Sequence, residues 1–134
     1  MGGVYVDTSA LGRILLGEPD ASAVLETLET FDRHVASRLA RVELQRLALR
    51  FAVLDQAEQL LRAVALIPVE EALLEAAETV RPESVATLDA IHLVTAIRLA
   101  DAGAIEAVLT YDLRLADGAR HHGLTALAPS AGRA

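Results

Sequence analysis

Two aspartates in this 134-residue chain each stand directly after a short apolar run and directly before a run with a helical pattern. Asp7 follows residues 4–6, and Asp112 follows residues 108–111. Ligands of open α/β sheets bind beyond the carboxyl ends of the strands, so two parallel strands would bring both carboxylates into one crevice. Each aspartate alone is equally well explained as a helix N-cap. Their matching positions favour a shared site.

A third acid, Asp89, lies in the first turn of the apolar helix expected over residues 88–99. One interpretation is an acid that the helix dipole favours, with Thr87 as the N-cap. Against it, a carboxylate among apolar neighbours needs a partner or a cation. The chain contains no lysine to supply one.

The fourth acid, Glu43, lies in the helix expected over residues 38–54. At 100° per residue it falls about 140° from Arg38, on the edge of the apolar face that includes Phe51. Arg46 and Arg50 fall at about 80° and about 120°, on the same stripe. A surface Glu–Arg pair is the simpler interpretation. In the alternative, functional interpretation, Glu43 faces the site with the other acids, and Arg46 and Arg50 line a groove that binds phosphate.

Four carboxylates in one crevice repel each other unless a cation binds. Oxygen ligands suit Mg²⁺ or Mn²⁺, and such a site can activate water for displacement at phosphorus. The absence of cysteine excludes thiolate zinc sites and cysteine nucleophiles, and the absence of lysine excludes a P-loop. His92 follows Asp89 by three residues, but a satisfied core histidine is the more economical interpretation.

The elements that must position these acids follow from the hydrophobic pattern. Short β-prone runs alternate with helical segments, which predicts an α/β domain with a mostly parallel sheet. Expected strands cover residues 4–6, 34–37, 66–69, 108–111 and 124–127, and expected helices cover residues 9–17, 20–31, 38–54, 55–65, 70–80, 88–99 and 112–123.

Four residues are expected to mark helix ends. Ser9 and Asp20 are the predicted N-caps of their helices, and Asp55 with Glu58 resembles a capping box. Gly123 is the predicted C-terminal stop of the last helix.

Length and charge set the remaining bounds. A chain of this length fits one domain, here residues 1–128, with a disordered tail expected over 129–134. Twelve basic and nineteen acidic residues leave a net charge of −7, which argues against a basic nucleic-acid coat. We see no secretion signal and no membrane-spanning run, and we therefore expect a cytoplasmic protein.

The motifs around the acids resemble those of the PIN-domain ribonucleases, and most closely the VapC toxins of VapBC toxin–antitoxin pairs. The resemblance rests on VDTSAL at residues 6–11, on Glu43 within a helix, on LDAIHLVTA at residues 88–96 and on LTYDLRL at residues 109–115. It covers about residues 3–128, and the last two motifs are specific in this order and spacing.

This resemblance implies a three-layer α/β/α PIN-like fold with a parallel sheet of four to five strands and Mg²⁺- or Mn²⁺-dependent endoribonuclease activity. It assigns catalysis and metal binding to four acids, and support of the metal shell to three hydroxyl residues. The acids are Asp7, Glu43, Asp89 and Asp112, and the hydroxyl residues are Thr8, Ser9 and Thr110.

The resemblance also implies a homodimer, an RNA substrate and a cognate VapB-type antitoxin. Its antitoxin would occupy a groove, for which the helices expected over residues 20–31 and 38–54 are candidates. The net charge of −7 departs from the positive charge that an RNA-binding protein needs, although bound divalent cations would offset part of the negative charge. A catalytically weak PIN-like module that binds proteins is the alternative, and the presence of all four acids favours the nuclease.

Overall fold

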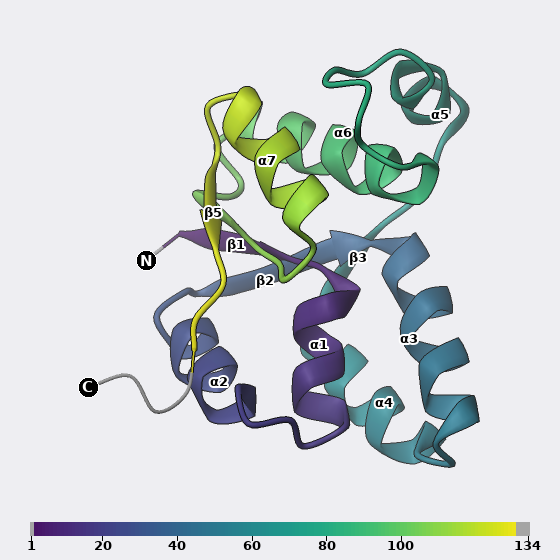
Figure 1. The fold of residues 1–134 in the computed structure, drawn as a ribbon, viewed down its shortest axis with the longest axis vertical. Helices are drawn as coiled ribbons and strands as arrows, with labels where there is room; N and C mark the ends of the chain where they lie inside the picture. The colour runs from purple at the N-terminus through teal and green to yellow at the C-terminus, as the bar shows by residue number, and fades with distance from the viewer. Residues whose placement is uncertain (1, 131–134) are drawn as a thin grey trace.

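The computed structural model describes residues 2–130, and its centre is a five-stranded sheet in which every neighbouring pair of strands is parallel. The strand order is β3-β2-β1-β4-β5, so the first strand lies in the middle (Figure 1). This confirms the predicted parallel α/β sheet. The strands are β1 (Gly3–Val6), β2 (Arg33–Ser37), β3 (Ala65–Ile67), β4 (Ala107–Leu109) and β5 (Thr125–Leu127).

Seven helices in the described part of the chain cover the two faces of the sheet. The first four lie on one face and the last three on the other, which makes the three predicted layers (Figure 1). The helices are α1 (Thr8–Leu15), α2 (Ala21–Glu29), α3 (Arg38–Arg50), α4 (Leu54–Leu61), α5 (Glu71–Ala77), α6 (Thr87–Asp101) and α7 (Leu113–His121).

The strand order places a topological switch point between β1 and β4. The chain winds from β1 outward through β2 to β3, and then returns to the other side of β1 for β4 and β5. Val6 pairs with Leu109 in the last register position, so the two strands end side by side. A crevice beyond the carboxyl ends of the strands is expected at such a point.

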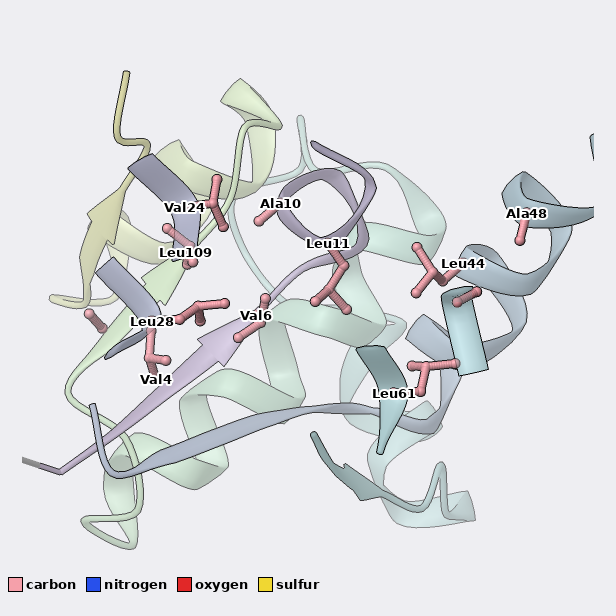
Figure 2. Packing of buried hydrophobic residues seen from close by; sticks show 12 residues of the cluster. Val4, Val6, Ala10, Leu11, Val24, Leu28, Leu44, Ala48, Leu61 and Leu109 are labelled. Atoms are coloured by element: carbon pink, nitrogen blue, oxygen red, sulfur yellow. The ribbon is translucent and has the colours of Figure 1, made fainter. Parts of the chain in front are cut away.

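A separate hydrophobic core fills each side of the sheet, because side chains alternate along a strand. Val4 and Val6 of β1 point to the side of α1–α4, where they pack with Leu11 and Leu44 (Figure 2). Tyr5 points to the other side and lies in the core that includes Leu93 of α6. The central strand is thus fully buried on both faces.

Three predicted helix caps are wrong. Helix α1 begins at Thr8 with Asp7 at the N-cap position, so Ser9 lies inside the helix. Thr87 likewise lies inside α6. In place of the capping box, Glu58 of α4 forms a two-pronged ion pair with Arg41 of α3. The tertiary contacts of Ser9 and Glu58 outweigh a capping preference of about 1 kcal/mol.

Helix α3 ends at Arg50, four residues before its predicted end. Phe51 is 54% exposed and Ala52 adopts a φ of 56°, so the apolar face stops before Phe51, contrary to the prediction. The buried stripe of α3 consists instead of Ala40, Leu44 and Ala48 at intervals of four. Small side chains let this helix pack closely on its neighbours α1 and α4.

The start of α2 and the stop of α7 agree with the sequence. Asp20 occupies the N-cap position of α2, and Gly123 follows α7 with a φ of 80°. At the C-terminal end, the Tyr111 hydroxyl donates to the carbonyl of Pro129. Of the tail expected over residues 129–134, residues 131–134 lie outside the described residues.

Candidate active site

Asp7 lies at the carboxyl end of the central strand and is 4% exposed. Its Oδ2 accepts hydrogen bonds from the hydroxyls of Ser9 and Thr110, both at 2.8 Å. Ser9 belongs to α1, while Thr110 directly follows β4. The buried carboxylate is therefore held by both chain segments that leave the switch point.

Backbone N–H groups orient these two hydroxyls. Ser9 Oγ accepts from the N–H of Tyr111 at 2.8 Å, and Thr110 Oγ1 accepts from the N–H of Asp112 at 3.0 Å. Because each oxygen already accepts one hydrogen bond, its own proton is directed to Asp7. Sequence analysis predicted both hydroxyls as supporting residues, and the structure places both in contact with Asp7.

Glu43 reaches the same place from α3. This helix follows β2 directly and is capped by the Ser37 side chain, which accepts from the N–H of Leu39 at 3.1 Å. The Oε1 atom of Glu43 accepts from Thr8 Oγ1 and from His92 Nε2, both at 2.7 Å. Burial raises the pKa of Glu43, but the bonds from His92 and Thr8 outweigh it and leave the pKa below its ordinary value.

Asp89 and Asp112 form the other half of the site, and a protonated Asp89 can donate a hydrogen bond to the Asp112 carboxylate. Burial raises the pKa of Asp89, and the neighbouring Asp112 carboxylate raises it further, to about 7. Burial also acts to raise the pKa of Asp112. The bonds from Asp89 and from the N–H groups of Arg114 and Leu115 outweigh it and lower that pKa.

The structure thus brings all four predicted acids to one end of the sheet. One ligand atom each of Asp7, Glu43 and His92 lies within 4.8 Å of the others. The charge of Asp7 contributes to the raised pKa of Asp89, which links the two halves.

His92 is the site residue whose role sequence reasoning missed. It is fully buried and hydrogen-bonded, as expected of a core histidine, yet its partners are Glu43 and the Tyr5 hydroxyl. Its Nε2 also lies 3.8 Å from Oδ1 of Asp7. The sequence did offer one signal for a role in the site, because His92 follows Asp89 by three residues and so lies on the same side of the helix. Only the tertiary structure shows that this ring also meets Glu43, which comes from the helix layer on the opposite face of the sheet.

Arg46 and Arg50 are exposed residues of α3. They line a groove of about 830 Å³ between α1 and α3, together with Arg13. Thr8 and Glu43 also line this groove, so it runs into the acidic site.

The donor atoms of the site suit a hard divalent cation. They are carboxylate oxygens with hydroxyl support, the set that Mg²⁺ and Mn²⁺ prefer. Within residues 2–130, no arginine forms an ion pair with any of the four acids, and His92 pairs with Asp7 and Glu43 only when its ring is protonated. Burial first, and then the neighbouring Asp112 carboxylate, disfavour the charged form of Asp89, as its raised pKa indicates.

The PIN domain family model matches residues 4–121 of the chain. This chain belongs to the PIN-domain family. Ribonuclease VapC46 of Mycobacterium tuberculosis strain H37Rv is 36% identical over 97% of this chain and 100% of its own length. Ribonuclease VapC47 of the same species is 34% identical over 97% of this chain and 99% of its own length. The predicted family resemblance is confirmed.

Solved structures support the PIN fold. A toxin–antitoxin complex from Klebsiella pneumoniae contains a chain with a TM-score of 0.73 and 19% identity, covering 96% of this PIN domain and 98% of that chain. Mycobacterium tuberculosis VapC20, described as a sarcin-ricin loop cleaving toxin, has a TM-score of 0.69 and 18% identity over 85% of this chain and 93% of its own. None of the helices described here is long and apolar enough to cross a membrane.

Proposed function

We propose that this PIN domain is a metal-dependent endoribonuclease that acts as the toxin of a toxin–antitoxin pair. The observation that carries the proposal is the meeting of four carboxylates, from four separate elements, at the end of a parallel sheet. The full-length similarity to ribonucleases of the VapC type supports it.

Asp7, Asp89 and Asp112 would hold Mg²⁺ or Mn²⁺, with Glu43 at a second position or orienting a water. Such a cation polarises the phosphate and lowers the pKa of bound water. Ser9 and Thr110 fix one oxygen of Asp7 and would thereby limit its motion. The lowered pKa of Glu43 keeps this carboxylate ionised, so that it could bind a cation or orient a water by accepting a hydrogen bond from it.

RNA would reach this site along the groove between α1 and α3. Arg46 and Arg50 supply positive charge there, whereas the chain as a whole is acidic. Phosphate contacts of this kind position the strand without selecting a sequence.

A VapB-type antitoxin is the proposed partner, and its docking surface is apolar. A groove of about 440 Å³ lies between α1, α2 and α4 and is lined by residues that include Ile14, Leu25 and Leu60. An amphipathic helix binds such grooves through apolar anchors. Helix α2, one of the two candidate helices from the sequence, lines this groove, and α3 lines the separate groove that leads to the acids. A homodimer and a cytoplasmic location complete the proposal.

The experiment is cleavage of total RNA by the purified chain with Mg²⁺, with Mn²⁺ and with EDTA. We expect cleavage that needs a divalent cation and is lost in Asp7→Asn. Asp117→Asn is the matched control, because Asp117 is an exposed acid of α7 whose side chain pairs with Arg120. Activity in EDTA or in Asp7→Asn would refute the metal-nuclease proposal. Antitoxin binding without any cleavage would favour the protein-binding alternative.

A further inference from the structure

His92 connects the buried face of the sheet to the acidic site. Its ring lies in α6 with no exposed surface. Its Nδ1 is 2.5 Å from the Tyr5 hydroxyl of β1, and its Nε2 is 2.7 Å from Oε1 of Glu43. The Tyr5 hydroxyl in turn accepts from the backbone N–H of Ser37 at 3.1 Å. One continuous chain of hydrogen bonds therefore runs from β2 to the carboxylate.

The Glu43 carboxylate decides which nitrogen carries the proton. An ionised carboxylate only accepts, so Nε2 must donate to Oε1. In the neutral ring Nδ1 is then unprotonated and accepts from the Tyr5 hydroxyl, whose oxygen accepts in turn from the N–H of Ser37. In the doubly protonated ring Nε2 carries a proton as well. In both forms the Nε2 lone pair is not available to a metal ion.

We infer that His92 is a positioning residue that holds Glu43 by donation from Nε2, and that it is not a ligand of the metal. The inference deepens the proposed function and rests on it for the role of Glu43. Although Asp7, Glu43 and His92 are close enough to share one ion, the hydrogen-bond chain assigns the ring to the support of the carboxylate.

The consequence for Glu43 is a defined orientation. Thr8 of α1 and His92 of α6 both donate to Oε1, and among the described residues no hydrogen-bond donor is assigned to Oε2. Partners that orient a ligand typically contribute 10- to 100-fold to metal affinity or activity. Glu43 is only half-buried, so we expect these two donors, rather than close packing, to hold its carboxylate in place.

The first test uses no enzymatic activity. Long-range ¹H–¹⁵N correlation spectra of the full chain, at about two pH units above the ordinary histidine pKa, report which ring nitrogen is protonated. We expect the Nε2–H form for His92 without metal and with Mg²⁺. An Nδ1–H form, or loss of the Nε2 proton on addition of Mg²⁺, would overturn the inference.

The second test is Mn²⁺ affinity, measured by electron paramagnetic resonance of the free ion. His92→Leu should lower the affinity on the order of tenfold. His92→Gln should stay within about threefold of the wild type, because its amide N–H can replace the Nε2–H donor. The matched control is Leu61→Ala in the α4 core, which should lower stability and leave Mn²⁺ affinity unchanged.

The outcomes separate the inference from the proposed function. Unchanged affinity in His92→Leu, or an equal loss in the Gln and Leu variants, would overturn the positioning role even if RNA is cleaved. The expected affinities together with no RNA cleavage would refute the nuclease and leave the positioning of Glu43 intact. If His92→Leu does not fold, Tyr5→Phe keeps the core volume and removes only the donor to Nδ1. The Glu43 carboxylate still requires a donor, so the ring should stay in the Nε2–H form. An Nδ1–H ring in Tyr5→Phe would overturn the inference.

Discussion

Replacing Asp89 by asparagine should stabilise the metal-free protein at alkaline pH. Burial and the Asp112 carboxylate raise the pKa of Asp89 from 3.8 to about 7. The folded state therefore binds more protons than the unfolded state between about pH 4 and about pH 7. Stability contributed by this group is fully present below about pH 4 and is lost as the pH rises to about 7. An asparagine stays neutral throughout and can still donate to Asp112.

The magnitude follows from the same pKa values. A pKa raised from 3.8 to about 7 corresponds to about 4 kcal/mol for a fully buried group. Asp89 is only partly buried, so solvent screening reduces the expected effect to about 1–2 kcal/mol. Asp89→Asn should therefore exceed the wild type by about 1–2 kcal/mol in free energy of unfolding at about pH 8, and the two should converge near pH 4.

Urea unfolding with EDTA, at several pH values between about 4 and 8, measures this difference. Asp117→Asn is the control, because its exposed carboxylate should change the free energy of unfolding by less than about 0.5 kcal/mol. Added Mg²⁺ should remove the advantage of Asp89→Asn by stabilising the wild type. Equal stabilities of wild type and Asp89→Asn at about pH 8 would refute the idea that the acids crowd each other.

Three further predictions concern the same site. Asp7→Asn should abolish RNA cleavage while the metal-free fold is at least as stable as the wild type, since it relieves like-charge repulsion; gel assays and urea unfolding measure both, and retained cleavage would contradict it. Changing both Arg46 and Arg50 to alanine should weaken RNA binding and flatten its dependence on salt, as measured by fluorescence anisotropy; an unchanged slope would mean that they do not contact phosphate. Thr110→Val should cost about 1–3 kcal/mol in unfolding, because a buried oxygen of Asp7 loses a donor; full stability would show that water replaces the hydroxyl.

Local patterns in the sequence were sufficient for the elements and for the acids. Asp7 and Asp112 could be recognised because each directly follows a β-prone run. A pattern of this kind can be read from a few neighbouring residues. The VDTSAL, LDAIHLVTA and LTYDLRL motifs were sufficient for the family. The errors at Ser9, Thr87 and Glu58 were also local. A capping preference of about 1 kcal/mol is too small to prevail where a side chain finds a stronger tertiary partner.

The sequence by itself determined a parallel α/β domain of the PIN family with four candidate acids, three of them at strand ends or in a first helical turn and Glu43 within a helix. Only the tertiary structure decided which groups those acids meet. The strand order brings β1 beside β4, so that Thr110 reaches Asp7 across 103 residues of chain. Side chains from the helix layers on opposite faces of the sheet also meet there, which places His92 on Glu43, 49 residues away. Such contacts depend on how separate elements are arranged. The spacing of residues within one element can place His92 beside Asp89 but cannot show that it meets Glu43.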